Sequence, residues 1–174
     1  MNRNRFIKTT GLLGLGTAFS NSLWGKIKNP TKVKIVLENE GKAINCLGDN
    51  QLIKLTGKDT DGQFTAIYLD NPPNTQIPLH VHENEDEVYK VLEGEVEFTV
   101  GGKTTLLKSN DMIFLPRNIP HTWKVVGTIN AKVDLAIFPA GLENMFEELS
   151  KLPTGKPDLQ KVAAICGKYK VQFV

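Results

Sequence analysis

Apolar and polar residues alternate in short segments along most of the chain after residue 31. The clearest segments are rich in β-branched and aromatic residues with a period of two, and they cover residues 33–37, 51–55, 64–69 and 96–100. Turn-forming sequences separate them, at residues 40–42, 48–50, 59–62 and 101–102. Asp61-Gly62 and Gly101-Gly102 are pairs that tight hairpins prefer, because such turns need positive φ. Many short strands between regular turns predict an all-β sandwich or barrel.

The pattern changes from a period of two to a helical period after Pro139. Apolar residues then recur at the spacing of an amphipathic helix, at Leu142, Met145, Phe146 and Leu149. Asp158 has the character of an N-cap for a second helix, which we expect to end at Gly167. Residues 170–174 form either one last strand or a tail. We expect this C-terminal helical extension, residues 141–174, to cover an open side of the barrel or a dimer face.

The first 22 residues have the layout of a bacterial export signal. A basic start precedes a mildly apolar run with small residues that offer a cleavage site: Arg3, Arg5 and Lys8, then residues 11–19, then Ala18 and Ser20. Residues 3–8 resemble a twin-arginine signal, but Asn4 stands where the second arginine belongs, so a general secretory route stays open. We therefore expect residues 1–22 to be an export signal and the mature protein to be periplasmic. The alternative is an N-terminal amphipathic helix on a cytoplasmic protein.

Length, composition and charge exclude several classes of protein. A chain of 174 residues with 40% hydrophobic and 23% charged residues fits one globular domain with its own core. No stretch approaches the roughly 20 apolar residues that span a bilayer. The formal net charge is +2, and removing residues 1–20 takes away three basic residues and no acid. A nearly neutral mature domain has no electrostatic reason to bind nucleic acid or an anionic membrane.

Two cysteines, Cys46 and Cys166, lie far apart in the sequence and in no metal-ligand spacing. They could pair in an exported protein, and the sequence leaves this open. They indicate little about the compartment.

All three histidines of the chain fall into one arrangement with a glutamate. His80 and His82 have one residue between them in an extended stretch, so strand alternation places both imidazoles on one face. A turn at residues 83–86 lets the chain double back, so that Glu87 on the next strand faces the histidines, and His121 comes from a later strand. Three imidazoles and one carboxylate are a ligand set that suits one divalent ion of Fe, Mn, Co, Ni, Cu or Zn. Taken singly, a histidine pair is more often a surface feature, and an acidic run such as residues 83–87 is more often a solvated loop.

The joint spacing of these residues resembles the two motifs of the cupin family. The first motif runs Gly-x5-His-x-His-x4-Glu-x6-Gly, and its matching positions are His80, His82, Glu87 and Gly94, with Asn74 in place of the first glycine. The second motif runs Gly-x5-Pro-x-Gly-x2-His-x3-Asn, in which Pro116 and His121 match, whereas Asn110, Asn118 and Val125 differ. Asparagine tolerates left-handed backbone best after glycine, so we expect the three turns to survive.

This resemblance implies a cupin-type double-stranded β-barrel, or jelly roll, over residues 31–140. It implies that His80, His82, Glu87 and His121 are the ligands of one divalent transition-metal ion. Residues 56–60, 78–82, 85–94 and 141–146 are further similar to one-domain bacterial cupins of the quercetin 2,3-dioxygenase type. That similarity implies a metal-dependent dioxygenase that cleaves a flavonol or another aromatic enol with O2. In such an enzyme Glu87 would take the proton of the substrate hydroxyl, and two chains would form a homodimer.

Three residues are expected to line a substrate cavity. Tyr89 and Val91 share the strand face of Glu87, and Trp123 shares that of His121. An apolar wall of this kind suits a flat aromatic substrate. The alternative for Tyr89 and Trp123 is ordinary barrel core.

Two other functions remain open from the sequence. A metal-dependent sugar isomerase or decarboxylase would need cationic groups in its cavity, for which Lys90, Arg117 and Lys124 are the candidates. A non-enzymatic cupin that binds a small molecule is the third hypothesis. The fold alone does not decide among them.

Overall fold

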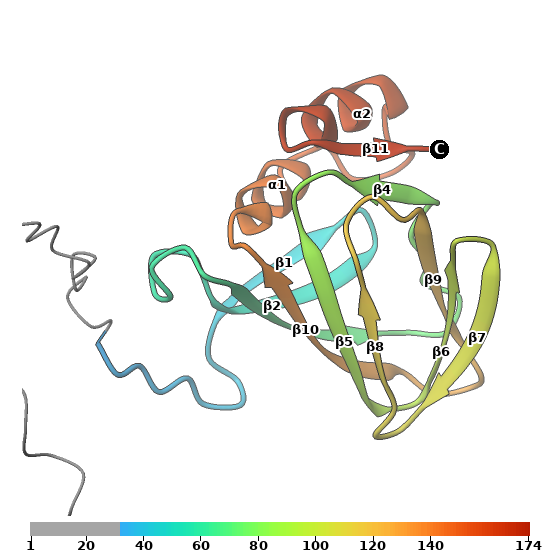
Figure 1. Ribbon diagram of the computed structural model, residues 1–174, viewed down its shortest axis with the longest axis horizontal. Helices are drawn as coiled ribbons and strands as arrows, with labels where there is room; N and C mark the ends of the chain where they lie inside the picture. The colour runs from blue at the N-terminus through green and yellow to red at the C-terminus, as the bar shows by residue number, and fades with distance from the viewer. Residues whose placement is uncertain (1–31) are drawn as a thin grey trace, which may run out of the picture. The chain divides into compact units, whose positions relative to one another are not determined.

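The computed structural model describes residues 32–174, which form a β-barrel of two antiparallel sheets with two helices at one end (Figure 1). The larger sheet contains, in spatial order, β1 (Lys42–Cys46), β2 (Asp49–Leu55), β3 (Thr65–Asn71), β10 (Ala131–Phe138), β5 (Asp86–Glu93) and β8 (Met112–Leu115). The smaller sheet contains β11 (Val171–Phe173), β4 (His80–His82), β9 (His121–Val126), β6 (Glu95–Val100) and β7 (Lys103–Lys108). This arrangement confirms the predicted jelly-roll barrel.

The alternation in the sequence corresponds to the inside and the outside of the barrel. Every second residue of β3 and of β9 is buried, and the side chains between them are only partly covered. The largest fully buried side chains in the interior include Phe98, Ile67 and Leu115. Removing each such side chain from water stabilises the fold by roughly 1.5–3 kcal/mol. The predicted strands at residues 51–55, 64–69 and 96–100 correspond to β2, β3 and β6.

Positive backbone φ angles occur where the sequence predicted turns. Gly101 and Gly102 have φ of 55° and 82° in the two-residue hairpin between β6 and β7. The three asparagines that replace motif glycines also have positive φ, with values of 72° at Asn74, 73° at Asn110 and 63° at Asn118. The expectation that these turns survive the loss of glycine is therefore confirmed.

Two sequence expectations about the N-terminal strands are wrong. Residues 32–37 are in no strand, and Val33 and Ile35 are 95% and 79% exposed. Strand propensity describes a fit to a half-buried sheet surface, and the part of the chain that the structure describes offers this segment no such surface. The turn expected at residues 48–50 lies one residue earlier, since β2 already begins at Asp49.

The C-terminal extension packs against the barrel at the end where β4 lies (Figure 1). It consists of α1 (Leu142–Leu149), α2 (Leu159–Lys168) and β11, which pairs with β4. Asp158 caps α2 as predicted, because its carboxylate accepts hydrogen bonds from the backbone N–H groups of Gln160 and Lys161. The predicted stop at Gly167 is wrong: Gly167 lies inside α2, and Lys170 takes the left-handed conformation, with φ of 61°.

The predicted export signal, residues 1–22, lies outside the described residues. Between residues 32 and 174, no helix is long and apolar enough to cross a membrane.

The sequence analysis placed the boundary between the barrel and the C-terminal extension after residue 140. In the structure β10 ends at Phe138, and α1 begins at Leu142.

Candidate metal centre

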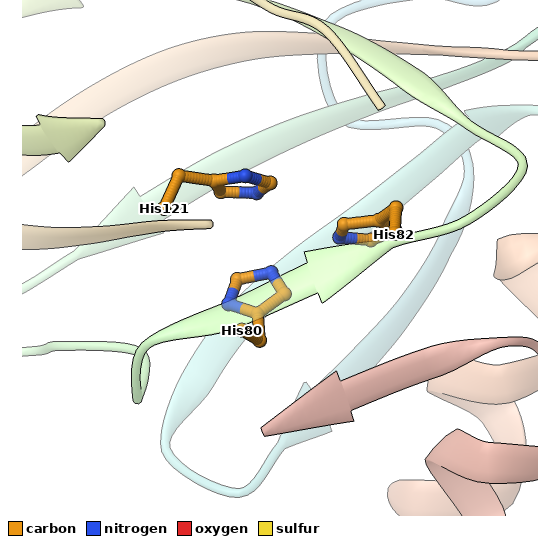
Figure 2. Close-up of side chains that lie close together, drawn as sticks. All are labelled: His80, His82 and His121. Carbon is orange, nitrogen blue, oxygen red and sulfur yellow. The ribbon is translucent and has the colours of Figure 1, made fainter. Parts of the chain in front are cut away.

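Three buried histidines meet inside the barrel (Figure 2). His80 and His82 are the two ends of the three-residue strand β4, and His121 is the first residue of β9, where it pairs with His80 across the sheet. The ring centroids lie 4.9 Å apart for His80 and His82, 4.4 Å for His80 and His121, and 5.3 Å for His82 and His121. One ring nitrogen from each histidine lies within 4.8 Å of those of the other two. The three histidines form a group that could bind a metal ion.

Backbone carbonyl groups orient two of the imidazoles. Nδ1 of His80 lies 2.8 Å from the carbonyl oxygen of Pro78, and Nδ1 of His121 lies 3.0 Å from that of Ile119. A carbonyl oxygen only accepts hydrogen bonds, so both Nδ1 atoms carry the proton and donate it. The Nε2 atoms therefore keep their lone pairs, which is the tautomer that a metal ion requires.

Glu87 brings a carboxylate to the histidines from the other sheet. It lies on β5, is 2% exposed, and places Oε2 3.2 Å from Nε2 of His121 and 4.0 Å from Nε2 of His82. Burial alone would raise the pKa of Glu87, but the interactions with His121, His82 and His80 outweigh it and lower the pKa below its usual value. The turn predicted at residues 83–86 is shorter, because β5 already begins at Asp86, and this segment carries the chain from the five-stranded to the six-stranded sheet.

The pKa values of two of the histidines are shifted in opposite directions. Burial, together with His121 and His82, lowers the pKa of His80 to about 4. Burial also opposes the charged form of His121, but the neighbouring Glu87 carboxylate raises the pKa of His121 above its usual value. His80 is therefore neutral at pH 7 and ready to act as a ligand.

Glu85 is a site residue that the sequence analysis treated as part of a solvated loop. It is only 8% exposed, and its Oε2 lies 3.6 Å from Nδ1 of His82. At this distance the two atoms form no hydrogen bond, and both are buried without a partner among the described residues, so Glu85 places a second carboxylate beside the histidines. The position of Glu85, three residues after His82, was the available signal in the sequence.

The chemistry of these side chains fits a divalent transition-metal ion. Nε2 of His82 and Nε2 of His121 are buried and accept or donate no hydrogen bond among the described residues. Nε2 of His121 lies close to Glu87 without the alignment of a hydrogen bond, as expected of two atoms that face a common point. Unpaired buried polar atoms are costly, and a cation would satisfy them. Imidazole with one carboxylate suits Fe, Mn, Co, Ni, Cu and Zn.

A cavity of about 640 Å3 opens beside this group. His80, His82 and Glu87 line it together with Trp123, and the C-terminal extension supplies most of its apolar wall, through Met145, Phe146, Leu149, Leu159, Val162, Ala163, Val171 and Phe173. The helices therefore cover the open end of the barrel, one of the two placements that the sequence analysis expected. Their role as the wall of the site was not foreseen.

Of the three residues expected to line the cavity, only Trp123 does so. Tyr89 and Val91 do not: both are packed in the barrel core, with 5% and 0% exposure. They face inward as expected but lie deeper, where side chains fill the barrel. Tyr89 still reaches the site, because its hydroxyl donates a long hydrogen bond of 3.5 Å to Oε2 of Glu87.

The three cationic residues considered for an isomerase or decarboxylase do not line the cavity. Among residues 32–174, no lysine or arginine belongs to its wall. Arg117 instead forms an ion pair with Asp86, 2.8 Å between Nη2 and Oδ2, at the surface. Lys90 and Lys124 alternate with the buried residues of their strands and so face outward.

Both cysteines are free thiols on the cavity wall. Cys46 ends β1 and Cys166 lies on α2, so the wall brings together two residues that are distant in the sequence. Burial raises the pKa of Cys46 to about 12, with smaller contributions from Asp49 and Cys166.

Comparison with known proteins agrees with this geometry. The model of the cupin domain family matches residues 68–141. A quercetin 2,3-dioxygenase of Bacillus subtilis is 29% identical over 119 residues, which are 67% of this chain and only 35% of that protein. An oxalate-binding protein of Thermotoga maritima is 36% identical over 82 residues, which are 46% of this chain and 68% of that protein.

The fold is also found among solved structures. KdgF from Halomonas sp. superposes with a TM-score of 0.57 at 17% identity, over 65% of this chain and 99% of that one. Identity this low shows a shared fold and nothing about activity. The matched family model, the Thermotoga relative and the two-sheet barrel with its buried histidines together show that the chain belongs to the cupin superfamily.

Proposed function

We propose that this cupin is a metal-dependent dioxygenase of the quercetin 2,3-dioxygenase type, which cleaves an aromatic enol with O2. The observation that carries the proposal is the position of His80, His82 and Glu87 on the wall of a mainly apolar cavity, with His121 grouped beside the other two histidines. The Bacillus relative supports it, although the chain spans about a third of that protein's length. The proposal assigns His80, His82, Glu87 and His121 as the ligands of one divalent ion.

Each ligand has a role that follows from its position. A divalent ion held by these four side chains would act as a Lewis acid and lower the pKa of a hydroxyl group that binds it. His80 and His121 are held by backbone carbonyl groups, so their Nε2 atoms are already oriented. Glu87 accepts the proton of the substrate hydroxyl, and the hydroxyl of Tyr89 donates to the same carboxylate oxygen and restricts its rotation.

The cavity favours a neutral aromatic substrate over a small anion. Its volume of about 640 Å3 lies within the usual range of sites for drug-sized ligands. Trp123, Phe146 and Phe173 provide flat or apolar surface, whereas its wall contains no lysine or arginine from residues 32–174 to neutralise a carboxylate. A flavonol meets both conditions.

Oxalate binding or decarboxylation is the second candidate, because the Thermotoga relative is an oxalate-binding protein. The cavity wall has carboxylates but no lysine or arginine from the described residues, so only the metal ion could offset the charge of a bound dianion. A cupin that binds an aromatic molecule without reaction is the third candidate. Neither the oxalate candidate nor the binding candidate would consume O2 with quercetin, which distinguishes both from the dioxygenase.

The proposal is tested by oxygen uptake on protein stripped of metal and reloaded with Fe, Mn, Co, Ni, Cu or Zn in turn. Each form is given quercetin and, separately, oxalate. The blank is His121→Ala, and Thr128→Ala, in the exposed loop before β10, is the matched control. We expect metal-dependent uptake with quercetin that the control retains and the blank loses. Binding of quercetin without uptake by any loaded form, or turnover of oxalate alone, would overturn the dioxygenase assignment.

We also propose that the protein is exported to the periplasm and forms a homodimer. The basic and apolar pattern of residues 1–22 supports export. Sedimentation of the purified protein and the N-terminal sequence of protein released from the periplasm test the two statements. A monomer, or a protein that keeps Met1 in the cytoplasm, would contradict them.

A further inference from the structure

A polar cluster lies on the cavity wall away from the histidines. Asp49 and Gln51 face the barrel interior from the start of β2, in the six-stranded sheet, whereas the histidines belong to the five-stranded sheet. Both residues are 4% exposed, and Asn71 at the end of β3 is 1% exposed. Among residues 32–174, Asp49 and Gln51 are the carboxylate and amide side chains on the lining apart from Glu87 and Gln76.

Hydrogen bonds fix the orientation of every side chain in this cluster. The backbone N–H of Asn50 donates to Oδ1 of Asn71, which turns Nδ2 of Asn71 toward Oδ1 of Asp49, 2.5 Å away. Nε2 of Gln51 donates to Oδ2 of Asp49 over 2.6 Å. The amide of Gln51 is therefore turned so that Oε1 points away from Asp49. This Oε1 is buried and accepts no hydrogen bond from any described residue.

The buried side-chain atom that lacks a partner in this cluster is an acceptor. Oε1 of Gln51 lacks a donor, and each oxygen of Asp49 keeps a further lone pair after its bond to an amide. Within residues 32–174, Asp49 forms no ion pair, and its side-chain partners are the two amides. The pKa of Asp49 lies above its usual value, because burial and the nearby Glu87 raise it by more than the hydrogen bonds from Gln51 and Asn71 lower it. A buried acceptor without a donor is costly, and a ligand that brings one recovers that cost.

We propose that Asp49 and Gln51 form a hydrogen-bond-accepting subsite, which binds a hydroxyl group of the substrate other than the one at the metal centre. The subsite selects neutral, polyhydroxylated aromatic molecules and disfavours ligands with a carboxylate at that end. This inference rests on the proposed function for its choice of an aromatic substrate. Gln51 is a specificity residue in this account and takes no part in the reaction with O2.

The test compares flavonols that share the metal-binding 3-hydroxyl and 4-oxo groups. Quercetin carries hydroxyl groups on both remaining rings, galangin carries them on one, and 3-hydroxyflavone carries none. Dissociation constants are measured without O2, by titration calorimetry on the full metal-loaded chain, so that no turnover is needed. The wild type should bind quercetin about 10- to 100-fold more tightly than 3-hydroxyflavone, the range expected when a buried acceptor that lacks a donor gains one. Galangin identifies the ring that reaches the subsite.

The variant Gln51→Met keeps the length and neutrality of the side chain and removes the acceptor, together with the N–H that donates to Asp49. It should reduce the preference for the hydroxylated ligand to less than about threefold while leaving the affinity for 3-hydroxyflavone unchanged. The matched control is Gln63→Met, an exposed glutamine outside the cavity, which should keep the wild-type ratio.

Three results would overturn the subsite. One is a wild-type ratio below about threefold, which needs no variant and so survives any failure of Gln51→Met to fold. Another is an unchanged ratio in folded Gln51→Met, and the last is no binding of any of the three flavonols. Failure of the proposed function would give another result. The ratio of the quercetin and 3-hydroxyflavone affinities would still depend on Gln51, but no metal-loaded form would consume O2.

Discussion

Glu143 links helix α1, which forms part of the cavity wall, to the barrel through hydrogen bonds. We predict the loss of stability when its carboxylate is removed. Its Oε1 accepts a hydrogen bond from the backbone N–H of Gly57, 2.8 Å away. Its Oε2 accepts from the hydroxyl of Thr65, at 2.6 Å, and from the backbone N–H of Gly141, at 2.7 Å. Glu143 is 5% exposed and lies in the first turn of α1, so one carboxylate joins α1, β3 and the loop after β2.

The size of the effect follows from these three bonds. A hydrogen bond to a charged group contributes about 1.5–3 kcal/mol, but three bonds to one carboxylate are not additive. We expect Glu143→Ala to lower the free energy of unfolding by about 3 kcal/mol, and Glu143→Gln, which keeps the shape and one acceptor, by about 1–2 kcal/mol. The control is Glu147→Gln on the same helix, which breaks a partly exposed ion pair with Lys42 and should cost less than about 1 kcal/mol.

The effect of Glu143 also has a predicted pH dependence. Burial opposes its charge, but the donors at Thr65, Gly57 and Gly141 lower the pKa of Glu143 below the ordinary value of 4.5. A lowered folded-state pKa stabilises the fold above the unfolded-state value, and this stabilisation is lost as the pH falls through the folded-state value. The difference between wild type and Glu143→Gln should therefore be complete at pH 7 and shrink below about pH 4.5.

Urea unfolding followed by circular dichroism measures both effects, with the denaturant slope checked for constancy. Because α1 carries Met145 and Leu149 on the cavity wall, Glu143→Ala should also weaken flavonol binding and leave metal stoichiometry intact. A loss of stability below about 1 kcal/mol in Glu143→Ala, or a wild-type advantage that does not change between pH 7 and pH 3, would refute the reasoning.

Three further predictions concern the ligands, a thiol and a turn. His121→Ala should bind metal more than about 100-fold more weakly than wild type while remaining folded, since removing even an outer partner of a ligand costs 10–100-fold; full metal content by mass spectrometry of the native protein would exclude His121 as a ligand. With a pKa of about 12, the buried thiol of Cys46 should react with iodoacetamide at pH 8 far more slowly in the folded than in the urea-unfolded protein, and equal rates would contradict its burial. Asn110→Val should destabilise the fold by roughly 1–2 kcal/mol, because Asn110 has φ of 73°, whereas Asn110→Gly should be nearly neutral; equal effects in thermal unfolding would show that the left-handed turn is unimportant.

The sequence predicted the barrel and the grouping of the three histidines because both depend on spacing. An alternating pattern specifies which side chains face inward, and the intervals between His80, His82, Glu87 and His121 carry the motif. The asparagine positions were predictable for a local reason, since left-handed backbone admits few residue types.

What the sequence did not predict depends on depth and on tertiary contacts. Period-two alternation places Tyr89 and Val91 inside the barrel, but it carries no information on whether a residue lies at the open end or in the filled core. The segment at residues 33–37 has strand propensity without a pairing partner among the described residues. The cluster of Asp49, Gln51 and Asn71 joins two strands, and no local pattern marks it.

The role of the C-terminal helices was also beyond the local pattern. Their amphipathic faces showed that one side of each helix is buried, but not that this side forms the wall of a cavity beside the three histidines. Glu85 shows the same limit, because an acidic loop and a buried neighbour of His82 have the same sequence.

Labelled dioxygen tests the central claim most directly. Metal-loaded protein is given quercetin under 18O2, and the product is analysed by mass spectrometry beside the His121→Ala blank. The account predicts that both oxygen atoms of one labelled O2 enter the product of the wild type, and that the blank forms none. A product without the label, or the same labelled product from the blank, would contradict a dioxygenase that works at the three histidines and Glu87.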